Sequence, residues 1–191
     1  MTRKEQKETR KKTILFTALE LFVKNGYFDT KITDIAAASS MSTGLLFHYF
    51  ESKEALLVEL VKMGAAATSS VEKKEDVDPA TFFDNYLEEI FTYAKEAPWV
   101  FNMFVLMSQA RRAGMPEEAR QIALSVNQID YCAKIIELGQ KKGVFREGDS
   151  RLLARYFWLT VQGIMEEMAF DPTLPAPNTK WITCILTCTS S

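Results

Sequence analysis

The fold is decided by residues 32–53, which read ITDIAAASSMSTGLLFHYFESK. Apolar residues around Ile35 recur at the spacing of one helical face, and a pair of serines then interrupts the pattern. Ser42 is a suitable N-cap for a second short helix, in which Leu46 and Phe50 form an apolar pair four residues apart. The stretch therefore predicts two short helices joined by a tight turn, which is a helix-turn-helix.

The second of these helices is expected to carry polar and aromatic side chains on its outer surface. With the apolar pair directed inward, Thr43, Phe47, His48 and Tyr49 remain outside. A soluble protein seldom exposes such a combination unless something binds there. Because a helix-turn-helix can place its second helix in the major groove of DNA, two interpretations of Phe47 stay open. They are contact with a thymine methyl group and packing toward the interior.

The wider segment resembles the N-terminal DNA-binding domain of the TetR family of transcriptional regulators. The matching elements follow one another in a single order and cover about a quarter of the chain. They are Lys24-Asn25-Gly26-Tyr27, Asp34-Ile35-Ala36, Ser42-x-Gly44-x-Leu46-Phe47-x-Tyr49-Phe50 and Ser52-Lys53-Glu54-x-Leu56. The resemblance implies an all-α protein with a three-helix DNA-binding domain at residues 1–52. Residues 53–191 would then form a helical domain for effector binding and dimerisation.

Three positions depart from the usual pattern of that family. Lys31 stands in place of a Thr that caps the second helix, so we expect Thr30 or Thr33 to cap it instead. Ser40 and Met41 replace a commoner Gly and Val in the turn. Because a residue with a Cβ seldom adopts a positive φ, we expect the turn to be strained or slightly different.

The resemblance and the chemistry of the side chains together predict contacts with DNA. The first turn of the second helix would approach base edges in the major groove, where Thr43 can form hydrogen bonds. Tyr49 and Lys53 match positions at which the family holds phosphates. His48 has no neighbour in sequence with which to act as a general base, so phosphate contact or a surface role is preferred. The predicted DNA contacts are Lys31, Thr33, Ser42, Thr43, Gly44, Leu45, Phe47, His48, Tyr49 and Lys53.

Charge is distributed unevenly along the chain. The formal net charge of the 191 residues is −2, which by itself argues against binding to nucleic acid. Residues 1–53, however, contain nine Lys or Arg against six acids, whereas the remainder contains 14 against 19. Attraction for phosphates is therefore concentrated near the N-terminus. Residues 1–12 are interpreted as a frayed leader over about the first eight residues, as an arm that becomes ordered on DNA, or as both.

Composition excludes several classes of protein. The hydrophobic content of 47% is enough for a sizeable core. The odd number of cysteines and the lack of an apolar leader indicate a reducing cytoplasm, and no apolar run approaches the ~20 residues of a membrane span. Cys184 and Cys188 are expected to be buried apolar side chains and not metal ligands. Neither a Gly-rich phosphate loop nor a catalytic cluster is found, so we expect no enzyme, cofactor or metal.

Apolar periodicity predicts helices throughout the rest of the chain. Gly163 lies inside one of them, which suggests the close approach of another helix. The predicted helices cover residues 9–25, 52 to about 74, two segments of 79–113 separated at Pro98, one long segment over 117–142, a segment that starts at Asp149, and a last one around 181–188.

Two groups of apolar residues are candidates for binding surfaces. The aromatic and Met side chains of residues 79–113 and beyond are interpreted as core or as an adaptable pocket, because the resembling family encloses an inducer there. Apolar stripes nearer the C-terminus are interpreted as a subunit interface or as intramolecular core. The candidate ligand contacts are Phe83, Tyr86, Trp99, Phe104, Met107 and Tyr131. The candidate interface residues are Leu153, Phe157, Val161, Ile164, Met168, Trp181, Ile185 and Cys188.

The leading hypothesis is a homodimeric repressor that a small apolar or amphipathic ligand releases from double-stranded DNA. A two-fold dimer would separate its recognition helices by one DNA turn, ~34–36 Å, and would require a near-palindromic operator. The alternative is an all-α adaptor for protein partners, with a degenerate helix-turn-helix.

Overall fold

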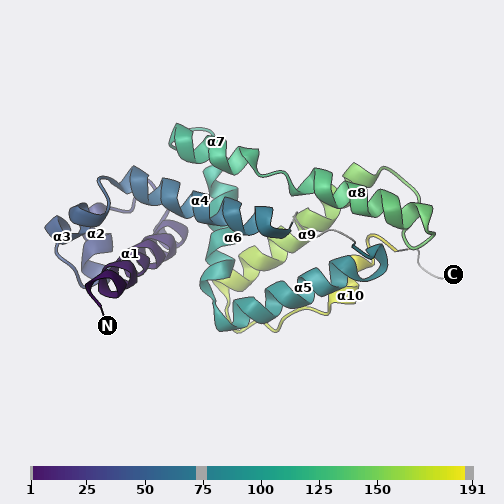
Figure 1. Ribbon diagram of the computed structural model, residues 1–191, viewed down its shortest axis with the longest axis horizontal. Coiled ribbons are helices and arrows are strands. Elements are labelled where there is room, and N and C mark those ends of the chain that lie inside the picture. Colours follow the sequence, from purple (N-terminus) through teal and green to yellow (C-terminus); the bar gives the residue numbers. More distant parts are fainter. Residues whose placement is uncertain (1, 72–76, 188–191) are drawn as a thin grey trace. The chain divides into compact units, whose positions relative to one another are not determined.

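The computed structural model describes residues 2–71 and 77–187, and the regular structure in these residues consists of helices α1 to α10 (Figure 1). The chain divides into two compact units. The first unit comprises Met1–Ala66 and Asn102–Ser125, and the second comprises Ala67–Phe101 and Val126–Ser191. Helices α4 (Lys53–Val71) and α6 (Trp99–Ala110) each contribute residues to both units. Within the described residues, no helix is long and apolar enough to cross a membrane.

Helix α1 (Arg3–Asn25) begins earlier than the sequence suggested. Thr2 and Glu5 form a capping box, in which the Glu5 amide donates to the Thr2 hydroxyl at 3.2 Å. The Thr2 amide in turn donates to the Glu5 carboxylate at 2.8 Å. These bonds satisfy amides that a helix start otherwise leaves free, so the frayed leader is a wrong prediction for these residues. The buried face of α1 consists of Ile14, Leu15, Ala18, Leu19 and Phe22.

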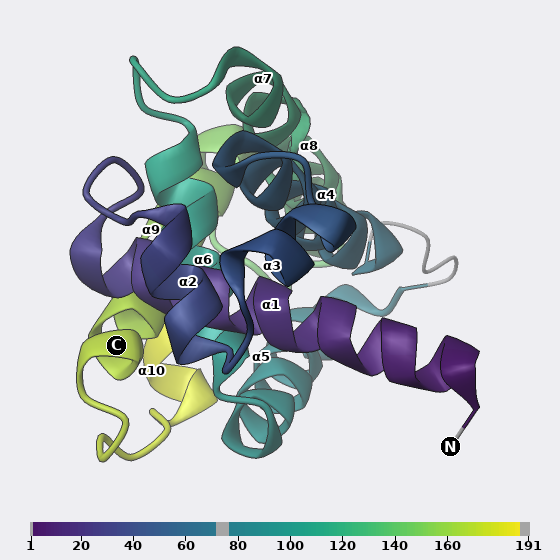
Figure 2. The same cartoon turned by 90° about the vertical axis from the view of Figure 1, so that its left-hand side faces the viewer.

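Helices α2 (Ile32–Ala38) and α3 (Thr43–Tyr49) form the predicted helix-turn-helix, and α2 packs against α1 (Figure 2). As predicted, Ser42 is the N-cap of α3, and its hydroxyl accepts from the Leu45 amide at 3.2 Å. Leu46 and Phe50 are buried, also as predicted. Ser40 in the turn has φ 56°, the positive φ of a non-glycine residue that the unusual turn composition suggested.

The start of α2 differs from the prediction. The Thr30 hydroxyl points back to the end of α1, where it bonds to the carbonyls of Gly26 at 2.8 Å and Leu21 at 3.1 Å. Lys31 occupies the N-cap position, and its amide donates to the Asp34 carboxylate at 3.1 Å. The expected cap from Thr30 or Thr33 is therefore wrong, because Asp34 satisfies this amide and Thr30 serves α1.

Close contacts join α4, α6 and α7 (Glu117–Ser125) within the first unit. A Cβ built on Gly64 of α4 would lie only 2.7 Å from the Met107 sulfur of α6, so a side chain at this position would force Met107 to shift. Lys62 of α4 forms an ion pair with Glu118 of α7 at 2.9 Å. These contacts attach α6 and α7 to α4, the helix that follows the helix-turn-helix in the chain.

The second unit is built around α5 (Pro79–Glu96), α8 (Gln128–Lys141) and α9 (Ser150–Phe170). Helix α8 packs against both α5 and α9, and the short α10 (Thr179–Thr183) contacts α5 and α9 (Figure 1). Polar N-caps set where these helices begin, since each accepts from a backbone amide of the first turn. They are Asp78, Asn127, Asp149 and Asn178.

Two predictions for this part of the chain are wrong, and a third, the close approach of another helix to Gly163, finds no such helix within the described chain. The long helix over 117–142 is interrupted after Ser125, because Asn127 leaves helical geometry (φ −126°, ψ 72°) and caps α8. The last helix ends at Thr183, and the Arg146 guanidinium then holds the carbonyls of Cys184 and Thr187. Gly163 is exposed, and a Cβ there would meet no atom of the described chain within 4 Å. The predicted end of α4 near residue 74 lies outside the described residues.

Replacement of Ser40 by glycine tests the strain in the turn. A glycine adopts a positive φ without a Cβ clash, so Ser40→Gly should raise the free energy of unfolding by about 0.5–1 kcal/mol. Ala37→Gly is the matched control, because it adds the same chain flexibility in α2 and should lower stability by about 1 kcal/mol. Urea denaturation measures both variants, and a loss of stability in Ser40→Gly would show that the turn is unstrained.

Candidate DNA-binding surface and ligand cavity

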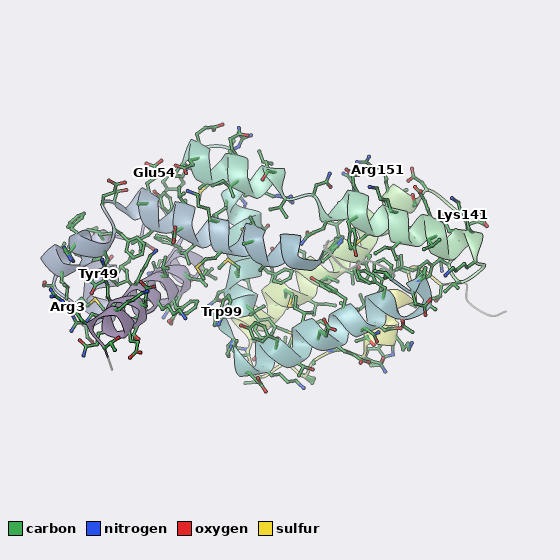
Figure 3. The ribbon with its side chains drawn as sticks, viewed as in Figure 1. Arg3, Tyr49, Glu54, Trp99, Lys141 and Arg151 are labelled. Atoms are coloured by element: carbon green, nitrogen blue, oxygen red, sulfur yellow. The ribbon has the colours of Figure 1, made fainter. Side chains whose placement is uncertain are left out.

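The outer surface of α3 carries most of the predicted DNA contacts. Gly44 and His48 are exposed, and Thr43, Leu45 and Tyr49 are half-buried. Phe47 is 47% exposed, so its ring does not pack into the core and remains available to a partner. Tyr49 lies at the end of the helix (Figure 3), with its ring edge-to-face to His48 at a centroid distance of 5.7 Å. On α2, Lys31 and Thr33 are also exposed.

Lys53 takes a different place from the other predicted contacts. Its ammonium donates to the carbonyls of Tyr27 at 2.7 Å, Thr30 at 2.9 Å and Phe28 at 3.3 Å. It also lies 4.4 Å from the centroid of the Tyr27 ring, which adds a cation–π interaction. Burial lowers the pKa of Lys53, and the nearby Asp29 carboxylate opposes this shift. An ammonium has three N–H donors, so Lys53 already uses its full capacity to tie the α1–α2 loop to the start of α4.

The N-terminal half of α1 adds positive charge to the first unit. Arg3, Lys7 and Arg10 are exposed and follow one another at helical spacing, and Arg3 is the first residue of α1 (Figure 3). Lys11 is held by an ion pair with Glu59 of α4 at 2.8 Å. The capped helix thus presents a basic face formed by Arg3, Lys7 and Arg10, suited to the phosphates of a nucleic acid.

A small cavity lies inside the second unit. Six aromatic side chains line it, three from α5, one from α8 and two from α9, and three further residues complete the lining. The cavity volume of about 10 Å³ is room for about one water molecule. A larger ligand therefore has to displace some of the rings. The lining residues are Thr68, Phe82, Phe83, Tyr86, Gln128, Tyr131, Cys132, Phe157 and Trp158.

The polar groups of this cavity differ in their hydrogen bonding. The Trp158 ring N–H donates to the Cys132 sulfur at 3.2 Å, and the Gln128 amide donates to the Thr68 hydroxyl at 3.3 Å. The Tyr86 hydroxyl forms no hydrogen bond with any described residue. Burial raises the pKa of Tyr86 far above its ordinary value, and the neighbouring Cys132 thiol adds to the shift. The phenol is thus neutral and has no hydrogen-bond partner in the described part of the chain.

Comparison with known proteins identifies the family. The model described as bacterial regulatory proteins, tetR family, matches residues 14–60, which contain the helix-turn-helix. The HTH-type transcriptional repressor NicS of Pseudomonas putida is 26% identical over 150 residues, or 76% of this chain and 70% of NicS. This chain belongs to the TetR family of transcriptional regulators.

Solved structures agree with the assignment to the TetR family. PfmR, a TetR family regulator from Thermus thermophilus, has a TM-score of 0.65 and 26% identity, covering 91% of this chain and 96% of PfmR. The MbdR regulator from Azoarcus sp. CIB has a TM-score of 0.78 over 93% of this chain and 97% of MbdR. At 22% identity, this second likeness concerns the fold alone. The predicted family and the all-α fold class are confirmed.

The cavity of this TetR family member contains only part of the predicted ligand set. Phe83, Tyr86 and Tyr131 line it. Trp99 lies instead at the start of α6 (Figure 3), edge-to-face to Tyr93. Phe104 and Met107 belong to the first unit. Sequence reasoning missed Phe82, although it lies four residues before Tyr86 on the same face of a helix. It also missed the cavity residues Thr68, Gln128, Cys132, Phe157 and Trp158.

The predicted subunit interface requires correction. Phe157, Val161 and Met168 are buried within the second unit, so they cannot form an exposed contact surface. Leu153, Ile164 and Ile185 are half-buried, Trp181 is 75% exposed, and Cys188 lies outside the described residues. Cys184 was expected to be buried but is exposed, and its thiol donates to the Trp181 carbonyl at 3.0 Å. The exposed apolar side chains of α9 are instead Leu152, Tyr156, Leu159 and Phe170.

Lys53→Met separates a positioning role from a phosphate contact. The change leaves three carbonyls without their donor, and water can reach this half-buried site, so we expect a loss of about 1 kcal/mol in the free energy of unfolding. Lys12→Met, at an exposed position of α1, should change stability by less than about 0.5 kcal/mol. Chemical denaturation gives both values. Unchanged stability of Lys53→Met together with weaker DNA binding would instead assign Lys53 to phosphate contact.

Proposed function

We propose that this protein is a homodimeric repressor that acts in the cytoplasm and binds a near-palindromic operator in double-stranded DNA. A small apolar or amphipathic ligand in the cavity of the second unit releases it. Residues 1–52 supply the DNA contacts, and residues 53–191 supply ligand binding and dimerisation. The capped and outward-facing α3 carries this proposal, because it lies within the segment that the TetR family model matches. The repressor named among its relatives, NicS, supports the direction of regulation.

The proposed DNA contacts divide into two roles. Thr43, at the first turn of α3, bonds a base edge, and Gly44 leaves room for the backbone to come close. Leu45 and Phe47 contact thymine methyl groups. The remaining residues hold phosphates, which fixes the position of the protein on DNA without specifying a sequence. They are Lys31, Thr33, Ser42, His48 and Tyr49, with Lys53 positioning the loop before α2.

A second copy of the chain is the proposed partner of the exposed face of α9. Three exposed apolar residues of α9 follow one another at intervals of four and three residues, so they lie on one face of the helix: Leu152, Tyr156 and Leu159. Gly163, four residues further on, lies on the same face. A two-fold axis would bring this face against itself, and the open space around Gly163 would allow the two helices to approach closely. This face replaces the buried residues of α9 in our assignment of the interface.

Release from DNA follows from a population shift. A ligand that pushes the rings of the cavity apart binds only the opened conformer, so it draws the protein toward that conformer. A change from 99:1 to 1:99 requires a preference of about 5.5 kcal/mol, which an enclosed aromatic cavity supplies more readily than a surface site. In the opened conformer that we propose, the two recognition helices of the dimer no longer match successive major grooves.

Binding to mixed-sequence duplex DNA tests the assignment of phosphate contacts. Lys31→Ala should weaken this binding and reduce the slope of log affinity against log salt by about one, because one phosphate contact is lost. Thr43→Ala should leave mixed-sequence binding unchanged, since its proposed partner is a base. Fluorescence anisotropy at several salt concentrations measures both variants. A protein indifferent to DNA would support the adaptor hypothesis, and the reverse pattern in the two variants would exchange the roles.

Leu159→Arg tests the proposed interface. Leu159 is 60% exposed, so the change should leave the subunit folded but place two charges against each other across the two-fold axis. Sedimentation should then show monomers. Leu124→Arg, at an exposed leucine of α7, is the matched control and should remain dimeric. A dimer in Leu159→Arg would move the interface away from this face.

A further inference from the structure

We propose that the ligand of the second unit is an uncharged, flat aromatic molecule of one or two rings with a hydroxyl or carbonyl group. We further propose that the Tyr86 hydroxyl is its polar anchor. The inference rests on the proposed function, because it takes the cavity as the effector site.

The shape of the ligand follows from the arrangement of the rings. Phe82 and Tyr86 lie nearly parallel, with an interplanar angle of 17° and centroids 6.4 Å apart. Trp158 and Tyr131 meet these two rings edge-on, at 5.5 Å from Tyr86 and 5.9 Å from Phe82 respectively. Aromatic groups prefer offset-stacked and edge-to-face contacts, and both are offered here from three helices. A flat ring can therefore replace the contacts that the side chains now make with one another.

The lining also selects against charge. None of the nine described residues that line the cavity is Asp, Glu, Lys, Arg or His. An ion that enters between these nine residues loses its hydration and finds no opposite charge among them, which is costly. Burial already raises the pKa of Tyr86, which shows that the same surroundings disfavour a negative charge. Among the described lining residues, a cation would gain attraction from the ring faces and would meet no carboxylate.

The hydrogen-bonding group of the ligand follows from the phenol of Tyr86. The single ring N–H of Trp158 donates to the Cys132 sulfur and one N–H of the Gln128 amide donates to the Thr68 hydroxyl, whereas Tyr86 bonds to no described residue. Its hydroxyl can donate and accept, so it matches either a carbonyl or a hydroxyl group. A largely buried phenol gains most from such a bond when it gives up no bond within the described chain to make it.

Titration with three two-ring probes of the same size tests the charge of the ligand. Calorimetry on the full chain at neutral pH compares uncharged 2-naphthol, cationic 1-methylquinolinium and anionic 2-naphthoate. We expect 2-naphthol to bind at least about tenfold more tightly than either ion. Tighter binding of 1-methylquinolinium would make the cavity a cation cage, and tighter binding of 2-naphthoate would require a positive group. Either result overturns the inference.

Tyr86→Phe tests the anchor. It should weaken binding of 2-naphthol about three- to tenfold and leave the melting temperature of the free protein unchanged or higher, because the hydroxyl bonds to no described residue. Tyr93→Phe is the matched control on the same helix, with a side chain that is 53% exposed and outside the cavity, and should bind as wild type. Unchanged affinity in Tyr86→Phe, or a lower melting temperature with weaker binding of all probes, would refute the anchor.

Binding to DNA in the same samples separates this inference from the proposed function. If the protein binds an operator but none of the probes, the ligand class is wrong and the repressor remains. If 2-naphthol binds in a Tyr86-dependent manner while DNA affinity stays the same, the cavity assignment holds and the proposed release mechanism fails.

Discussion

The burial of Leu46 and Phe50 is the constraint on which the DNA-binding surface depends. Both side chains are removed from water, and they lie four residues apart on one face of α3 and its C-cap. A helix with this face fixed inward has no freedom to rotate, so Gly44, Phe47 and His48 must point outward. Burial of two such side chains is worth several kcal/mol, which is more than any cap or surface ion pair contributes. The orientation of the recognition helix is thus a consequence of its core.

Two local features then hold the helix-turn-helix in place. Ser40 accepts a positive φ, which allows the chain to reverse between α2 and α3. Lys53 joins the loop before α2 to the start of α4 through three carbonyls. Helix α4 itself contains Lys53 near its start, Gly64 against Met107, and Thr68 beside the cavity. One helix therefore carries residues that belong to both proposed activities, which makes it the natural element through which the ligand would act on DNA binding.

The sequence predicted those features that depend on residues close to one another. The cap at Ser42, the buried pair of α3, the unusual turn at Ser40 and the start of α9 after Asp149 all rest on spacings of a few residues. The capping box of Thr2 and Glu5 was equally local but was hidden by the high charge of the segment. Asn127 likewise interrupts a periodicity that continues on both sides of it.

The features that were missed depend on contacts between distant parts of the chain. Helix α9 is apolar on more than one face, and periodicity alone does not show that Phe157 faces the core and Leu159 the solvent. The cavity joins residues from α4, α5, α8 and α9, and no short motif marks this arrangement. Lys53 was assigned to phosphates from the family resemblance, whereas its partners in the structure are carbonyls 23 to 26 residues away, which sequence spacing does not show.

Selection of bound sites from a random pool of duplex DNA by the full-length protein tests the central claim most directly. If the outward face of α3 reads base pairs in a two-fold dimer, the enriched sites will be near-palindromic, with half-site centres about one helical turn or a multiple of it apart. Thr43→Ala will relax the preference at one base pair of each half-site. A pool without enrichment, or enriched sites without two-fold symmetry, would contradict the claim.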